Sequence, residues 1–130
     1  SMLTDYATTL TCVLAQSGQN TNSQELAATT GIEVQTIKKI MRLLRISGIV
    51  KASQGCKGGY ELYMPLAKIP LTALIEAIEG PTSLTKCPSQ TCAHQSHCFT
   101  QSRWQQINLE LHGILQRYSL ADFLTMESQA

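Results

Sequence analysis

No apolar run in this 130-residue chain approaches the roughly 18 residues that a membrane-spanning helix needs. The N-terminus has no charged stretch followed by an apolar one, so no secretory signal is expected. Internal repeats and low-complexity tracts are absent as well. No Ser–His–Asp set, phosphate-binding loop or pair of carboxylates indicates catalysis. These absences favour a cytoplasmic protein that is not an enzyme and has no membrane partner.

Charged residues are few, at 15% of the chain against 43% hydrophobic residues, so a core is expected rather than disorder. The net charge of +1 is unevenly distributed. Between Glu33 and Lys57 the chain carries +5, with Glu33 as its only acid, whereas the remainder carries −4. The cations of this segment are Lys38, Lys39, Arg42, Arg45, Lys51 and Lys57. One basic patch on an otherwise acidic molecule is therefore expected.

Apolar residues at helical spacing predict three helices in the first part of the chain. The first covers residues 3–16. The second is short and begins at Asn22, which can cap it while Glu25 reaches back. Gly31 then provides a turn before the third helix, residues 33–47. Two short helices around a glycine turn are typical of a DNA-binding helix-turn-helix.

A β-hairpin is predicted directly after these helices. Residues 49–53 and 60–63 are strand candidates on either side of a glycine-rich turn that carries Lys57. A hairpin in this position is a wing, and the third helix would be the recognition helix. A solvated face on an ordinary helical domain is the alternative for the basic helix alone. The winged order favours DNA binding.

The third helix would place its polar face in the major groove of DNA. Gln35, Thr36 and Lys38 lie near its N-terminal end, where they can meet base edges, and Arg42 lies further along, where phosphates are the expected partners. The full set of predicted DNA-contacting residues is Ser23, Gln35, Thr36, Lys38, Lys39, Arg42, Gln54 and Lys57.

A long helix is predicted over residues 99–118, with an apolar stripe whose steps alternate between three and four residues. The stripe consists of Trp104, Ile107, Leu111, Ile114 and Tyr118. It either packs on its own domain or pairs with a second copy. We favour a two-fold homodimer, because two recognition helices about one duplex turn apart would bind a palindromic operator.

Three of the five cysteines are crowded into one polar segment. They are Cys87, Cys92 and Cys98, with His94 and His97 between them. Thiolates are preferred ligands of iron–sulfur clusters and of soft metals. Zinc sites favour tight Cys-x-x-Cys pairs, although a histidine could complete four ligands here. The spacing alone supports a cluster and zinc equally, and reduced structural cysteines or a disulfide are further alternatives.

Several motifs together resemble the Rrf-two family of bacterial regulators, which includes the IscR and NsrR types. They are Leu3-Thr4-Asp5-Tyr6, Gly31-Ile32, Ser47-Gly48-Ile49-Val50, Gly55-Cys56-Lys57-Gly58-Gly59-Tyr60, residues 75–81, the three cysteines and Trp104. The branch that the chain resembles most is the regulator of the SUF iron–sulfur assembly operon. The resemblance implies a homodimeric winged-helix transcription factor with a [2Fe-2S] or [4Fe-4S] cluster, and it favours the cluster over zinc.

The resemblance also implies a set of ligands. The three cysteines match the family's cluster ligands. IscR-type members use a histidine three residues after the last cysteine, where this chain has Gln101. NsrR-type members use an aspartate from the first helix of the other subunit, and Asp5 occupies that place. We therefore expect Asp5 of the partner subunit as the fourth ligand, with His94 or His97 as the alternatives.

The sequence thus predicts a mainly α protein in three parts. Residues 1–66 would form a winged helix-turn-helix, residues 67–98 a connecting helix and the cysteine loop, and residues 99–130 a dimerisation helix with a short final helix. The expected function is transcriptional regulation of iron–sulfur assembly genes, with operator binding controlled by the cluster. The alternatives are a winged-helix protein with structural or sensed zinc and an iron–sulfur carrier that does not bind DNA.

Overall fold

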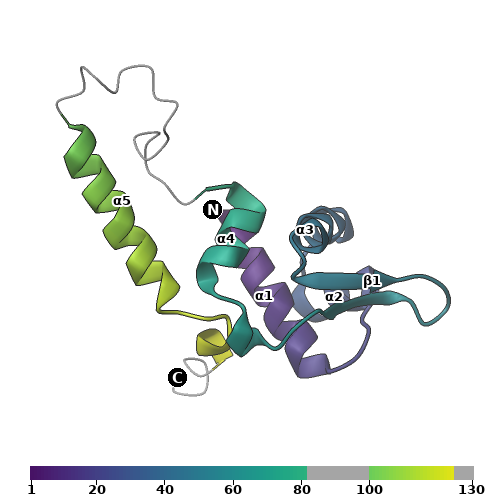
Figure 1. The fold of residues 1–130 in the computed structure, drawn as a ribbon. Coiled ribbons are helices and arrows are strands. Elements are labelled where there is room, and N and C mark those ends of the chain that lie inside the picture. Colours follow the sequence, from purple (N-terminus) through teal and green to yellow (C-terminus); the bar gives the residue numbers. More distant parts are fainter. Residues whose placement is uncertain (82–99, 125–130) are drawn as a thin grey trace.

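The computed structural model describes residues 1–81 and 100–124. Its elements are, in chain order, α1 (Met2–Ser17), α2 (Ser23–Thr30), α3 (Val34–Ile46), β1 (Val50–Ser53), β2 (Gly59–Leu62), the 3-10 helix η1 (Leu66–Lys68), α4 (Leu71–Glu79) and α5 (Gln101–Gln116). Residues 121–124 are again helical. Figure 1 shows the hairpin projecting beside α2 and α3, with α5 on the other side of the molecule. The predicted mainly α, winged helix-turn-helix fold is confirmed.

Local signals fix the limits of α2 and α3. The Glu25 backbone N–H donates to Asn22 Oδ1 at 2.8 Å, and the Asn22 N–H donates to Glu25 Oε2 at 3.2 Å, so both halves of the predicted capping box are present. Gly31 ends α2 with a φ of 77°. Gly48 follows α3 with the same φ, in the left-handed region that glycine enters at little cost.

One hydrophobic core joins the helix-turn-helix to the later helices. Its fully buried members are Ala7, Leu10, Leu26, Ile37, Ile40, Met41, Leu44, Leu74 and Leu120. Burying one large aliphatic side chain contributes roughly 1.5–3 kcal/mol to the stability of the fold. The burial of this set is therefore a large favourable term in the free energy of folding. Leu74 from α4 and Leu120 from beyond α5 belong to the same core as α3, so α3 is packed in one core with the later helical segments.

The wing is a two-stranded antiparallel sheet. β1 pairs with β2 in the register that sets Val50 opposite Leu62 and Ser53 opposite Gly59. Val50 is buried against the core, whereas the rest of β1 is exposed. The hairpin is therefore anchored at its base and projects toward solvent.

The end of α5 is attached to the start of α4 by a short backbone strap. Leu71 N–H donates to the Tyr118 carbonyl at 2.9 Å, and Leu120 N–H donates to the Ile69 carbonyl at 3.0 Å. Figure 1 shows the C-terminal end of α5 leading to this strap, while its N-terminal end lies away from α1 and α4. The orientation of α5 is thus set largely from one end.

Several helix and strand boundaries differ from the sequence prediction by one or more residues. A proline is well tolerated in the first turn of a helix, but Pro70 lies just before α4 with an extended ψ of 149°. The bridge between Pro70 and Ser119 explains this, because it holds Pro70 in an extended conformation. In the described part of the predicted helix 99–118, α5 extends only from Gln101 to Gln116.

Candidate nucleic-acid interface and metal site

The two sides of α3 have opposite character. Ile37, Ile40, Met41 and Leu44 are fully buried. The predicted DNA-contacting side chains lie on the other side, where Gln35, Lys38, Lys39 and Arg42 are exposed and Thr36 is half-buried. This arrangement follows from the 3.6-residue period of the apolar positions. The structure therefore brings these five predicted residues together on one solvent-facing surface.

The cations of this surface are not neutralised by acidic side chains of the described residues. Within residues 1–81 and 100–124, no ion pair involves Lys38, Lys39, Arg42 or Arg45. Four like charges on one helix face repel one another and attract polyanions. Phosphates of a nucleic acid can neutralise them with release of counterions.

Ser23 is the remaining predicted residue of the helix-turn-helix. It is the first residue of α2 and is half-buried beside the Asn22 cap. The capping box fixes the direction in which the chain enters α2, and the contacts between α2 and α3 fix the two helices relative to each other.

The base of the wing is held by the turn between α1 and α2. Thr21 and Tyr60 exchange two backbone hydrogen bonds, both 2.9 Å long. Asn20 Nδ2 donates to Ser53 Oγ at 3.1 Å, on the opposite strand of the hairpin. A Cβ at Gly59 would lie 2.7 Å from the Thr21 carbonyl carbon, so only glycine permits this approach. Sequence reasoning missed these contacts.

The tip of the wing carries the remaining predicted contacts. Gln54, Cys56 and Lys57 are all exposed. Lys51, unlike Lys57, has partners for its charge. Its Nζ lies 3.4 Å from Glu61 Oε1 and 5.9 Å from the centroid of the Tyr63 ring. Lys51 was counted in the basic patch, but its charge is partly balanced within the wing. Lys57 has no such partner among the described residues.

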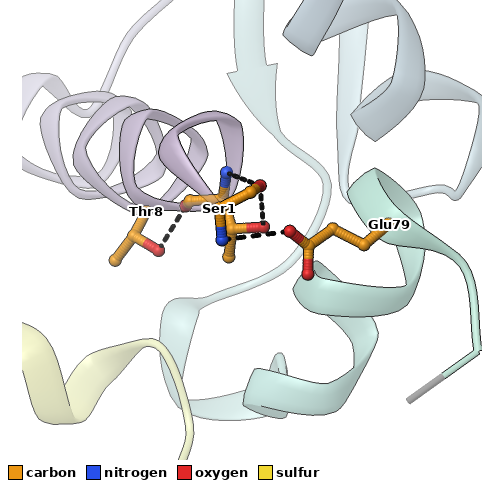
Figure 2. Close-up of polar contacts among 4 residues, drawn as sticks. Ser1, Thr8 and Glu79 are labelled. Atoms are coloured by element: carbon orange, nitrogen blue, oxygen red, sulfur yellow. Dashed lines mark hydrogen bonds and ion pairs between the residues drawn. The ribbon is translucent and has the colours of Figure 1, made fainter. Parts of the chain in front are cut away.

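The N-terminus of α1 contacts the end of α4. The Ser1 amino group lies 3.0 Å from Glu79 Oε1, as Figure 2 shows. The Ser1 hydroxyl and amino groups lower the pKa of the exposed Glu79 carboxyl. Thr8 Oγ1 donates to the Thr4 carbonyl at 2.9 Å on the same stretch of α1.

Asp5 lies at this same end of the molecule. Its backbone N–H donates to the Ser1 carbonyl at 3.2 Å, and its side chain is exposed. Glu79 is the last residue of α4, from which the chain continues through Gly80 toward the cysteine segment. Asp5 and the end of α4 are therefore linked through Ser1, which contacts both.

The predicted metal ligands other than Asp5 lie outside the described residues. These are Cys87, Cys92 and Cys98, together with the alternatives His94 and His97. Residues 1–81 and 100–124 contain no group of three or more His, Cys, Asp or Glu side chains that could hold a metal. Three thiolates and one exposed carboxylate are nevertheless a donor set that suits an iron–sulfur cluster, since iron accepts both sulfur and oxygen ligands.

The stripe of the predicted dimerisation helix is incompletely covered. Trp104, Ile107 and Leu111 are half-buried, whereas Ile114 and Tyr118 are 48% and 47% exposed. The one buried side chain on α5 in the described part of the chain is polar Asn108. Among the described residues, the apolar stripe is therefore only partly buried.

No helix in the described segments combines the length and the apolar character that crossing a membrane requires.

Known proteins that are similar to this chain include transcriptional regulators. The chain matches the Rrf2 family, described as an iron-dependent transcriptional regulator, over residues 1–126. It is 26% identical over 123 residues to protein rrf2 of Nitratidesulfovibrio vulgaris, covering 92% of this chain and 82% of that protein.

Two solved structures share the fold. IscR of T. potens has a TM-score of 0.73 at 24% identity, covering 100% of this chain and 90% of that one. CymR, the global cysteine regulator of B. subtilis, has a TM-score of 0.72 at 21% identity, covering 97% and 95%. The description of the family and the name of CymR both denote a regulator. With an exposed recognition helix, a wing and a family match over nearly its whole length, this chain belongs to the Rrf2 family of winged-helix transcriptional regulators.

Proposed function

We propose that this regulator binds a palindromic operator as a homodimer and that an iron–sulfur cluster controls the binding. The observation that carries the proposal is the polar face of α3, whose cations have no ion pair in the described part of the chain. This face lies beside an anchored wing, and the chain that leaves α4 goes on to three closely spaced cysteines.

The proposed DNA contacts divide by chemistry. Gln35, Thr36 and Lys38 lie in the first turns of α3 and would meet base edges in the major groove. Arg42 lies on the exposed face two turns further along, where phosphates are the expected partners. Ser23, Lys39, Gln54 and Lys57 would add backbone contacts from α2, α3 and the wing. A bidentate base contact contributes roughly 1–3 kcal/mol of discrimination.

The proposed cluster ligands are Cys87, Cys92 and Cys98 with Asp5 of the partner subunit. A bound [2Fe-2S] or [4Fe-4S] cluster would supply a redox-sensitive link between the cysteine segment and α1. In this chain, α1 packs against α3 and α4 in one core, so a restraint at its N-terminus can reach the recognition helix. A coupling of about 1–3 kcal/mol would change operator affinity roughly 5- to 150-fold.

The homodimer is proposed from the exposed stripe of α5. We propose residues 1–66 as the DNA-reading part, 67–98 as the connecting and cluster part, and 99–130 as the dimerisation part. Iron–sulfur assembly genes are the proposed targets, by resemblance to the regulators of such operons. The fold alone does not require a cluster, since CymR shares it and is named as a cysteine regulator.

Anaerobic purification followed by operator titrations tests the proposal. We expect visible absorption and iron in the purified protein, and at least a severalfold difference in operator affinity between the cluster-bound and cluster-free forms. Equal affinity in both forms would eliminate control by the cluster. Zinc in place of iron would favour the structural-zinc alternative, and failure to bind any promoter would favour the carrier.

Matched variants assign the ligands in the same experiment. Cys92→Ser should abolish cluster binding, because it removes a thiolate ligand. Asp5→Ala should change the visible spectrum and make the cluster more labile, whereas Glu33→Ala removes an exposed carboxylate on another helix boundary and should do neither. An Asp5→Ala protein with an unaltered spectrum would transfer the fourth-ligand role to His94 or His97.

A further inference from the structure

A polar cavity lies where α5 is attached to the rest of the molecule. It is open to solvent, with a volume of about 350 Å³, and it is lined by η1, the residue before α4, the end of α5 and the segment from there to Asp122. This volume is at the lower end of the range for small-molecule sites. Nothing in the proposed DNA or cluster binding uses this cavity.

Two cations line the cavity from different elements. Lys68 is the last residue of η1, and Arg117 directly follows α5. In the part of the chain that the structure describes, neither side chain makes an ion pair or a hydrogen bond. A lysine and an arginine that share a cavity and form no ion pair favour the binding of an anion, and arginine in particular can hold a carboxylate or a phosphate through two hydrogen bonds.

The one carboxylate in the lining is already engaged. Asp122 Oδ2 accepts a hydrogen bond from the Ser119 backbone N–H at 2.8 Å, which caps the helical residues 121–124. The cavity lining therefore carries a net positive charge, and the Lys68 and Arg117 donors remain for a ligand. Asp122 adds repulsion that would disfavour large polyanions, so a small anion is the best match.

From this arrangement we infer that the cavity binds a small organic dianion, either a dicarboxylate or a phosphate ester, between Lys68 and Arg117. Such a ligand would connect η1 to the end of α5 directly. Among the described residues, the backbone hydrogen bonds across this joint are those from Leu71 to Tyr118 and from Leu120 to Ile69, at 2.9 and 3.0 Å. A third link would restrain the angle at which α5 leaves the core.

The consequence for regulation rests on the proposed function. If α5 is the dimerisation helix, its angle sets the separation of the two recognition helices. An anion that fixes this angle would then change operator affinity. Binding of the anion itself does not depend on dimerisation, on the cluster or on DNA, so the two parts of the inference can fail separately.

Isothermal titration calorimetry on the full chain tests the site, with succinate and inorganic phosphate as probes and sodium chloride at matched ionic strength as the reference. We expect one anion per chain and a rise in the unfolding temperature. The double variant Lys68→Gln/Arg117→Gln should lose affinity by about tenfold or more, since two charged hydrogen-bond donors are removed. Tighter binding of succinate would identify a dicarboxylate ligand, and tighter binding of phosphate a phosphate ester.

The control variant Lys51→Gln/Arg103→Gln removes two cations elsewhere and should bind as the wild type does. Lys68→Arg keeps the charge and should keep most of the affinity. A cooperative unfolding transition of the double variant, measured without anion, would show that its loss of affinity is not a folding defect. No heat of binding beyond that of chloride, or equal affinity in the double variant, would overturn the site. Anion binding without any change in operator affinity would overturn its regulatory role alone.

Discussion

The backbones of Thr21 and Tyr60 are joined by two hydrogen bonds, each 2.9 Å long, and this pair ties the wing to the start of the helix-turn-helix. Thr21 immediately precedes the Asn22 cap of α2, while Tyr60 lies in β2. The two parts of the molecule that we propose to contact DNA are therefore fixed to each other through the backbone as well as through the core. The angle between wing and recognition helix is set at this point.

Gly59→Ala should displace the wing. The new Cβ would lie 2.7–2.9 Å from backbone atoms of Thr21 and Asn22, which cannot rotate away as a side chain would. The φ of 155° at Gly59 adds backbone strain. We expect a loss of about 1–3 kcal/mol in the free energy of unfolding, measured by urea denaturation, together with weaker operator binding.

Gly113→Ala is the matched control for this substitution. Gly113 lies within α5, its Cβ would meet nothing within 4 Å, and its φ is not positive. The same change should therefore leave operator binding intact and raise stability by up to about 1 kcal/mol, because alanine favours a helix. If Gly59→Ala were as stable as the wild type, the close approach of Gly59 to Thr21 would be ruled out.

Most of the fold was predictable because its signals are local. The capping residues Asn22 and Glu25, the turn at Gly31 and the apolar period of α3 each act within a few residues, and each was confirmed. The wing was predictable for the same reason, since a hairpin is encoded by two short strands and their turn.

The features that were missed involve partners far apart in the chain. Asn20 contacts Ser53 across 33 positions, and the Lys51–Glu61 pair depends on the register of the hairpin. The strap that holds Pro70 extended also joins distant residues. No periodicity in a single sequence reports such contacts. The glycine doublet before Tyr60 was the one available signal that another backbone comes close to the wing.

Glu79→Gln should make stability less dependent on pH in the acidic range. Ser1 lowers the pKa of the Glu79 carboxyl in the folded protein, so this group contributes stability above the pKa that it has when unfolded. The contribution is lost as pH falls through the folded pKa. Urea denaturation between about pH 7 and pH 3 should show the wild type more stable than the variant at the upper end, with the difference vanishing on acidification.

The effect should be small, because Glu79 is exposed and screened by solvent. Glu33→Gln provides the control, since its carboxylate makes neither a side-chain cap nor an ion pair in the described segments. A constant difference between wild type and Glu79→Gln across this range would show that the Ser1 contact does not contribute to stability.

Lys57→Gln should weaken operator binding more than Lys51→Gln does. Lys57 is exposed at the tip of the wing, whereas Lys51 lies 3.4 Å from Glu61 and over the Tyr63 ring. Removing one phosphate contact lowers the slope of log affinity against log salt by about 1. Titrations at several salt concentrations should show this decrease for Lys57→Gln only. An equal decrease for both variants would mean that the Glu61 pair opens when DNA binds.

Ile114→Glu should separate the proposed dimer into folded monomers. Ile114 is 48% exposed within one chain, so a charge there costs little in the monomer but is buried without a partner in a helix seam. Leu109→Glu is a demanding control, because Leu109 is even more exposed, at 74%, yet lies off the predicted stripe. Sedimentation equilibrium should show a monomer for the first variant and a dimer for the second. Dissociation of both would place the interface on a different face of α5, while a dimer in both would exclude α5 as the main contact.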